Sequence, residues 1–314
     1  MTFRAKDVAF MRKNLQDHNP TAIKPYIWLV GLGDSILAGV AATSPASDDL
    51  AVGKGVGYSF YVNNEVSLIG RIQKGQNGLA GYSSLPALAQ RLFDETGWRV
   101  AATFMPKAAT SGVYESWGDK QPRYHWDVDH SDGNMLTRID GTLDRSTILP
   151  MSKAAIDRCP GIDVQRTFVL WAGGSFDAGG ITEGLIVQQD ITDKLIALKD
   201  WAKVNIGADG MFFYESCVIG DGQTEAEATQ ANDNDIDGLR AAQLSAEAAD
   251  PEIWCVYRQP DNDTDLYAAF AVNGDGTVDV GYQLHDGVHW SQAMQDAVGR
   301  TAAQIYIAPI VGSV

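Results

Sequence analysis

The sequence has little cysteine, little positive charge and no long apolar run. Its three cysteines, Cys159, Cys217 and Cys255, are odd in number, widely spaced and without a CxxC pair, so no disulfide framework is predicted. Cys217 and Cys255 lie in apolar runs typical of strands. We therefore expect buried free thiols.

Positive charge is scarce, because 24 Lys and Arg stand against 40 Asp and Glu, which gives a formal net charge of −16. Such a surface repels nucleic acid phosphates and anionic lipids, so neither a nucleic acid nor a membrane is expected as a partner. An acidic surface that keeps the protein in solution is the simplest interpretation.

No stretch approaches the length of apolar residues that crosses a bilayer. Residues 1–6 also lack the continuous apolar segment of a signal peptide. These absences predict a soluble protein without a signal peptide, either cytoplasmic or part of a larger secreted or viral assembly.

What is present suits one large α/β domain. The 314 residues are 45% hydrophobic, enough for an ample core, and we expect a single domain over 1–314 with an insertion at about 113–150 and loops or a hairpin at about 43–82. Apolar runs predict strands at 25–32, 100–105, 166–172, 211–219 and 253–257. Helices are predicted at 83–98, 152–158, 182–202, 236–248 and 291–306, and a hairpin at 268–282. This alternation predicts a three-layer sandwich with a mostly parallel central sheet covered on both faces.

In such sheets reactive groups gather at the carboxyl ends of the strands. Gly33-Asp34-Ser35-Ile36 directly follows the first predicted strand. A sharp turn there would expose the Ser35 hydroxyl above the sheet and aim its backbone N–H at the same space, as attack on an acyl carbon requires. An ordinary turn can have the same tripeptide.

Near the other end of the chain, Asp286-Gly-Val-His289 precedes the last predicted helix. His289 can act as a general base for a distant serine while Asp286 orients its imidazole. Alone, the same spacing also fits a helix cap or half of a metal site.

Two glycine motifs follow the second and third strands. Ser111-Gly112 lets the backbone approach a ligand, so that the Gly112 N–H can donate to an oxyanion. The stretch from Trp171 to Gly180, WAGGSFDAGG, again has glycines and a small polar residue at a strand end.

The order of these four motifs resembles the four conserved blocks of SGNH/GDSL hydrolases, over the sheet framework from about Pro25 to Ile307. The resemblance implies a flavodoxin-like SGNH fold and a Ser35, His289 and Asp286 triad. It also implies an oxyanion hole built from the N–H groups of Ser35 and Gly112, and no cofactor.

The third block is similar to the WxQGExDA-like block of carbohydrate esterases, which include sialate O-acetylesterases and acetyl xylan esterases, and Arg240-Ala-Ala-Gln243 is similar to an Arg-x-x-Gln stretch of that group. Departures are the Asp34-Ser35-Ile36 form of the first block and Gly173-Gly174-Ser175 in place of Gln-Gly-Glu. The superfamily's Asn, a side-chain oxyanion donor, is missing, and Ser175 is the candidate replacement. Loss of one oxyanion donor typically costs about 2.7–4 kcal/mol of transition-state stabilisation.

These observations predict a serine esterase that hydrolyses O-acyl, in particular O-acetyl, esters on a small molecule or glycan. One alternative is a lipid or short-chain acyl esterase. Another is a non-catalytic carbohydrate-binding or virion-surface module that retains the fold, which the missing Asn motivates.

Three further patterns have two interpretations each. Asp233-Asn-Asp-Ile-Asp-Gly238 matches the opening of a calcium loop, but Leu244 occupies the twelfth position, so a polar loop before a helix is expected instead. His125 and His130 stand near two aspartates, where a solvated loop is favoured over a metal site, so no metal is predicted. The rings of Trp117, Tyr124 and Trp126 would either stack on sugar faces or form the insertion's own core.

Overall fold

The described part of the chain forms a seven-stranded sheet with helices on both faces. The structure is a computed structural model. It describes residues 24–34, 37, 57–62, 66–71, 83–107, 110–118, 124–131, 133–137, 145–159, 161–215, 225–257 and 292–314.

The centre of the sheet is β1 (Lys24–Gly33), which lies between β4 (Arg99–Phe104) and β5 (Ile162–Ala172). The other strands are β2 (Gly57–Val62), β3 (Val66–Arg71), β6 (Gly210–Tyr214) and β7 (Ile253–Tyr257). In the order β3-β2-β4-β1-β5-β6-β7, every neighbouring pair is parallel except β2 and β3, which pair antiparallel at one edge. The predicted mostly parallel sheet is confirmed.

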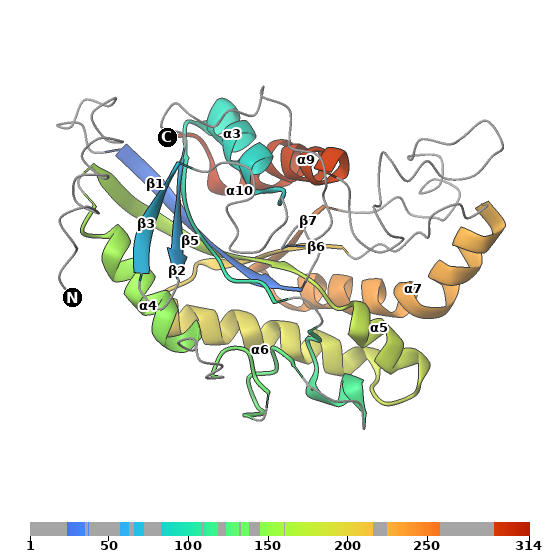
Figure 1. The fold of residues 1–314 in the computed structure, drawn as a ribbon. Helices are drawn as coiled ribbons and strands as arrows, with labels where there is room; N and C mark the ends of the chain where they lie inside the picture. Colours follow the sequence, from blue (N-terminus) through green and yellow to red (C-terminus); the bar gives the residue numbers. More distant parts are fainter. Residues whose placement is uncertain are drawn as a thin grey trace.

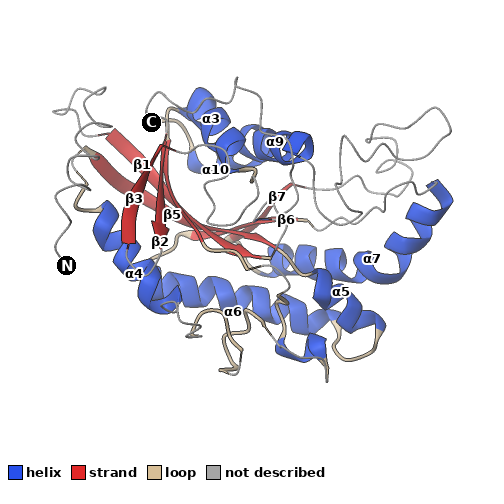
Figure 2. Ribbon diagram, viewed as in Figure 1, coloured by secondary structure: helices blue, strands red, loops and turns tan. Residues whose placement is uncertain are grey.

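The helices form the two outer layers (Figures 1 and 2). One face is covered by α3 (Leu85–Thr96), α9 (Gln292–Thr301), the π-helical turn η3 (Ala302–Ile307) and α10 (Ala308–Val311). The opposite face is covered by α4 (Arg145–Ile156), α5 (Ser175–Thr182), α6 (Gln188–Ile206) and α7 (Glu225–Ala249). The three-layer sandwich is thereby confirmed. None of the helices in the described ranges is long and apolar enough to cross a membrane.

The continuous apolar run of β1 follows from its burial on both faces. Ile27 and Leu29 pack in the core beneath α3 and α9, whereas Trp28 and Val30 pack in the core beneath α6 and α7. Trp28 is fully buried, and its indole N–H donates to the Thr103 hydroxyl on β4 at 3.0 Å. The hydrogen bond removes the cost of burying that polar group.

Helix α3 matches its prediction at both ends. Its N-cap is Ser84, with a proline directly after the first helical residue, and it ends at Gly97 in the left-handed conformation (φ 81°), where the Gly97 N–H donates to Phe93 O at 2.8 Å. The Ser84 hydroxyl, however, bonds to the Tyr214 hydroxyl at 3.0 Å, with no side-chain bond to its own helix. That bond ties α3 to the carboxyl end of β6.

Three boundaries differ from the predictions. α4 begins at Arg145, although the sequence predicted residue 152. The helix expected at 182–202 is α6, which begins at Gln188, and α5 was not predicted. The polar stretch 233–238, expected as a loop, lies inside α7. The buried Leu239, Ala242 and Ala246 anchor the second half of α7 to the core. Such packing outweighs the low helix propensity of Asp, Asn and Gly.

Two further predicted elements lie wholly or partly outside the described residues. The hairpin predicted at 268–282 lies outside them entirely, and so do residues 216–219 of the strand predicted at 211–219.

Candidate active site

The three predicted triad residues, Ser35, Asp286 and His289, lie outside the described residues, so the triad stays a prediction. Ser175 and Trp117 are described for their backbone alone: Ser175 is the first residue of α5, and Trp117 ends the 3₁₀ turn η2 (Tyr114–Trp117). What the structure does describe is the framework around the nucleophile's position.

The first and third motifs meet at the carboxyl ends of β1 and β5. The backbone N–H of Asp34 donates to Ala172 O at 2.9 Å. Gly33 has a φ of 135°, and a Cβ on it would lie 2.0 Å from the same carbonyl oxygen, so only glycine fits. A Cβ on Gly173 would lie 3.1 Å from the Asp34 nitrogen. The predicted nucleophile turn therefore begins in close backbone contact with the third motif.

The second and third motifs are joined by Asp177, a buried residue in the first turn of α5. Its Oδ2 accepts a hydrogen bond from the Gly112 N–H at 2.7 Å. Its Oδ1 accepts from the Val113 N–H at 3.0 Å and from the Ser116 hydroxyl at 2.6 Å. One carboxylate thus fixes the loop after β4 against the start of α5.

The N–H of Gly112, predicted to hold the oxyanion, already has an acceptor in this arrangement. A Cβ on Gly112 would lie 2.9 Å from Asp177 Oδ2, so the missing side chain lets the carboxylate approach. For Gly112 to donate to a substrate, its bond to Asp177 would have to open. Its oxyanion role stays a prediction with that added requirement.

Burial raises the pKa of Asp177 to about 6, because a charged carboxylate is poorly solvated inside the protein. The three donated hydrogen bonds oppose this shift, and the negative charge of Asp34 adds to it. Asp34 is itself buried, with 2% of its surface exposed. Two neighbouring buried carboxyl groups therefore lie at the carboxyl ends of β1 and β5.

Helix α7 reaches this region through Gln243, a member of the predicted Arg-x-x-Gln stretch. The buried Gln243 amide donates to Gly173 O at 3.3 Å, so this hydrogen bond fixes the third motif to α7. A small cavity lies beside it. Its walls include Gly112, Trp126, Trp171, Asp177, Lys194, Leu239 and Gln243.

Of the three aromatic residues suggested for sugar stacking, Trp126 is excluded. It is 1% exposed, packs edge-to-face on Trp171 at 5.9 Å, and donates its indole N–H to the Thr110 hydroxyl at 2.9 Å. Trp126 therefore packs in the main core on the α6 and α7 face of the sheet, and neither on a sugar nor in a separate core of the insertion. Tyr124 is half-buried, with the Lys107 ammonium 5.6 Å from its ring centre.

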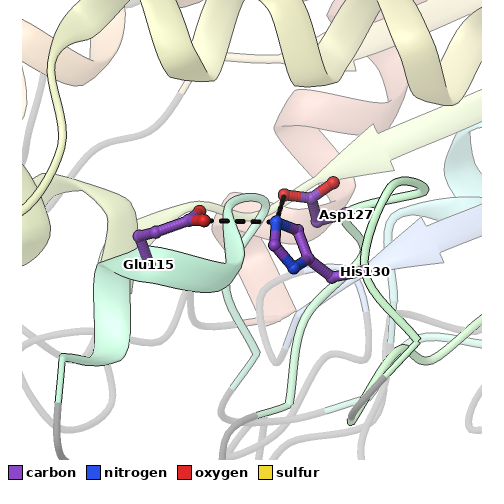
Figure 3. A group of neighbouring side chains, drawn as sticks. All are labelled: Glu115, Asp127 and His130. Atoms are coloured by element: carbon purple, nitrogen blue, oxygen red, sulfur yellow. Dashed lines mark ion pairs between the residues drawn. The ribbon is translucent and has the colours of Figure 1, made fainter.

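The predicted solvated loop around the two insertion histidines is wrong for His125. Its side chain is completely buried, and its Nδ1 accepts a hydrogen bond from the Asp127 N–H at 3.0 Å. His130 is partly exposed and lies beside Glu115 and Asp127 (Figure 3). These three are potential metal ligands.

Sequence reasoning gave no role to Asp177 or Ser116. One signal was available: Asp177 is the single charged residue between Trp171 and Ile181, in a stretch of small and apolar residues after a buried strand. A lone carboxylate in such a stretch indicates a buried acceptor.

The comparisons with known proteins find similarity in structure alone. No protein-family model and no curated protein matches the chain. A protein from Arabidopsis thaliana is similar at a TM-score of 0.54 and 11% identity, over 90% of this chain and 98% of that one. A carbohydrate acetylesterase from Xanthomonas citri has a TM-score of 0.52 and 15% identity, over 88% of this chain and 55% of that one. NanS has a TM-score of 0.50 and 10% identity, over 92% and 97%. At 10–15% identity these likenesses show that the chain shares the fold of these proteins.

Proposed function

We propose that the protein is a serine esterase that hydrolyses O-acetyl esters on a carbohydrate. The observation that carries the proposal is the meeting of three motifs at one edge of the sheet: the turn before Ser35, the Gly112 loop and the Gly173 turn. This edge, at the carboxyl ends of parallel strands, is where α/β folds bind and convert ligands.

In the proposed reaction the Ser35 oxygen attacks the ester carbonyl while His289 takes the hydroxyl proton. His289 then gives that proton to the departing sugar oxygen, which leaves an acyl-enzyme. A water molecule, deprotonated by His289, attacks the acyl-enzyme and releases acetate and free Ser35. Asp286 orients His289 and stabilises its charged form. The Ser35 N–H stabilises the oxyanion, with Gly112 and Ser175 as the other donors.

Two observations support acetylated carbohydrate as the substrate class. The Xanthomonas citri protein of the same fold is a carbohydrate acetylesterase. The third motif, from Trp171 to Asp177, resembles the corresponding block of carbohydrate esterases, and its buried Asp177 connects that block to the Gly112 loop.

The test is covalent labelling with a fluorophosphonate probe, together with acetate release from a panel of acetylated glycans. We expect Ser35→Ala to abolish both, and His289→Ala to reduce both severely. Ser245→Ala is the matched control, because Ser245 is exposed on α7 and its hydroxyl bonds to Ala241 O of its own helix. Persistent labelling of the Ser35→Ala variant would contradict the proposed nucleophile.

The same experiments separate the alternatives. A p-nitrophenyl ester series that favours a long acyl chain over acetate would indicate a lipid esterase. A folded wild-type protein that is neither labelled nor active would indicate a binding module that retains the fold.

A further inference from the structure

We propose that Glu115, Asp127 and His130 bind one divalent transition-metal ion such as Zn²⁺, although the sequence predicted no metal. Glu115 lies on η2, and the other two lie on the loop 124–131 (Figure 3). Their ligand atoms all lie within 4.8 Å of one another. His130 Nε2 is 3.1 Å from Glu115 Oε1 and 4.0 Å from Asp127 Oδ2. One imidazole nitrogen with two carboxylate oxygens suits Zn²⁺ better than Mg²⁺ or Ca²⁺, which prefer oxygen ligands alone.

The Asp127 carboxylate is fully buried, yet its two oxygens are unequally bonded. Oδ1 lies 3.0 Å from the Lys194 ammonium and accepts the Asp129 N–H at 3.0 Å. Oδ2 has a long 3.5 Å contact with the Tyr114 N–H and otherwise faces His130. A buried carboxylate oxygen normally has a close partner. A metal ion between Oδ2 and His130 would supply it.

The ligands are held in place by contacts that do not involve an ion. The His130 ring stacks on Tyr114 at 4.6 Å with a 13° angle between the rings. The Asn134 amide donates to the backbone oxygens of Asp127 and His130, at 2.6 and 2.7 Å. Such outer contacts orient metal ligands in advance and strengthen binding.

The local charge also favours a divalent cation. The three carboxylates of Glu115, Asp127 and Asp129 outnumber the one ammonium beside them, that of Lys194, which pairs with Asp127 and Asp129. The side chains of His130 and Glu115 are 39% and 48% exposed, which leaves the ion a path from solvent.

The consequence of binding would be structural. The ion would join η2 to the loop 124–131, and η2 carries Ser116, whose hydroxyl bonds to Asp177. Metal binding would therefore stabilise the loop that begins with Gly112. The inference stands whether or not the protein is an esterase, because its readouts are binding and stability.

The experiment uses the untagged full chain, stripped with a chelator and dialysed. Zn²⁺ is titrated by calorimetry, Co²⁺ by its visible absorption, and thermal unfolding is followed with and without Zn²⁺. We expect one saturable ion per chain and a higher unfolding midpoint. His130→Gln and Glu115→Gln should each weaken Zn²⁺ binding by at least about tenfold, the lower end of the effect of changes near a metal site. Both positions are partly exposed, so the metal-free variants should unfold near the wild-type midpoint.

Asp94→Asn is the matched control, since Asp94 is an exposed carboxylate on α3, on the opposite face of the sheet. It should leave affinity, midpoint and Co²⁺ spectrum unchanged. The proposal is overturned if the wild-type protein shows no saturable Zn²⁺ binding. It is equally overturned if both ligand variants bind Zn²⁺ as tightly as the wild type, or if Mg²⁺ binds as tightly as Zn²⁺.

Discussion

Asp177 is the residue on which the candidate site depends most among those described. It is buried beside Asp34, and it is the common acceptor for Gly112, Val113 and Ser116. A buried carboxylate is costly to ionise, but the three donors next to it would also be costly to leave without an acceptor. The pKa of Asp177 is raised because the cost of burial exceeds the effect of the hydrogen bonds. The same hydrogen bonds make Asp177 a positioning residue for the Gly112 loop.

Replacing Asp177 should destabilise the protein. In Asp177→Ala three donors, two of them on buried residues, lose their acceptor. We expect the free energy of unfolding to fall by about 3 kcal/mol, at about 1–3 kcal/mol per unsatisfied group. Asp177→Asn should lower the free energy of unfolding by less. Its amide oxygen can still accept hydrogen bonds, but its amide N–H₂ cannot accept one from the donor that it faces. Urea unfolding followed by circular dichroism measures both. Asp193→Asn, an exposed change on α6, should stay within about 0.5 kcal/mol of the wild type.

The raised pKa of Asp177 predicts a particular pH dependence. Its pKa is about 6 in the folded state against 3.8 ordinarily, so folding favours the protonated form. The carboxyl group therefore contributes most to stability below about pH 4, and this contribution is lost as pH rises through about 6. We therefore subtract the unfolding free energy of Asp177→Asn from that of the wild type. This difference should be larger at pH 4 than at pH 7. If the stability difference between wild type and Asp177→Asn were larger at pH 7 than at pH 4, the raised pKa would be contradicted.

At the scale of the elements, α5 depends on how closely it packs on η2. A Cβ on Gly180 would lie 3.0 Å from the Ser116 Cα, whereas a Cβ on Gly179 would meet nothing within 4 Å. Neighbouring glycines in one helix therefore have different roles. Gly180 permits the contact that brings Ser116 to Asp177.

These two glycines provide a matched pair of substitutions. Gly179→Ala should stabilise the protein by up to about 1 kcal/mol, the difference in helix propensity between alanine and glycine. Gly180→Ala should destabilise it by about 1–3 kcal/mol, because the added methyl group presses on the backbone of η2. Chemical unfolding of both variants measures the contrast. Equal effects of the two changes would mean that η2 moves aside without cost.

An element was predictable from sequence where the residues at its ends and its apolar pattern indicate the same structure that packing favours. Residues 83–98 have a serine before the helix, a proline in its first turn and a glycine at its end, and α3 follows closely. The glycine-rich stretch that follows the third predicted strand was not predicted to be helical, yet α5 begins at Ser175. Packing against η2 and α7 decides that segment, and neither neighbour could be identified from local sequence.

At the scale of the whole molecule, the sequence order of the first three motifs was enough to predict where those three meet. The carboxyl ends of β1, β4 and β5 share one edge because these strands are parallel neighbours. The bonds between motifs were not predictable. Gly112 and Asp177 are 65 residues apart, and the Lys194 bond that links α6 to Asp129 spans the same separation. They depend on how the chain after β4 packs on α5 and α6, which no local pattern specifies.

The net charge of −16 gives a prediction for the entire protein. At about 10 mM salt the screening length is about 30 Å, the size of a domain, so the acidic groups repel one another across the folded chain. We expect the thermal unfolding midpoint at pH 7 to rise when NaCl is increased from about 10 to about 300 mM, as differential scanning calorimetry can measure. At pH 4.6, near the pI of about 4.6, the repulsion is largely cancelled and the same addition should have little effect. A midpoint that falls with salt at pH 7 would mean that ion pairs such as Lys199 with Asp250, 2.7 Å apart, outweigh the repulsion. Pairs of this kind lose strength on screening, so the sign of the salt effect decides which term dominates.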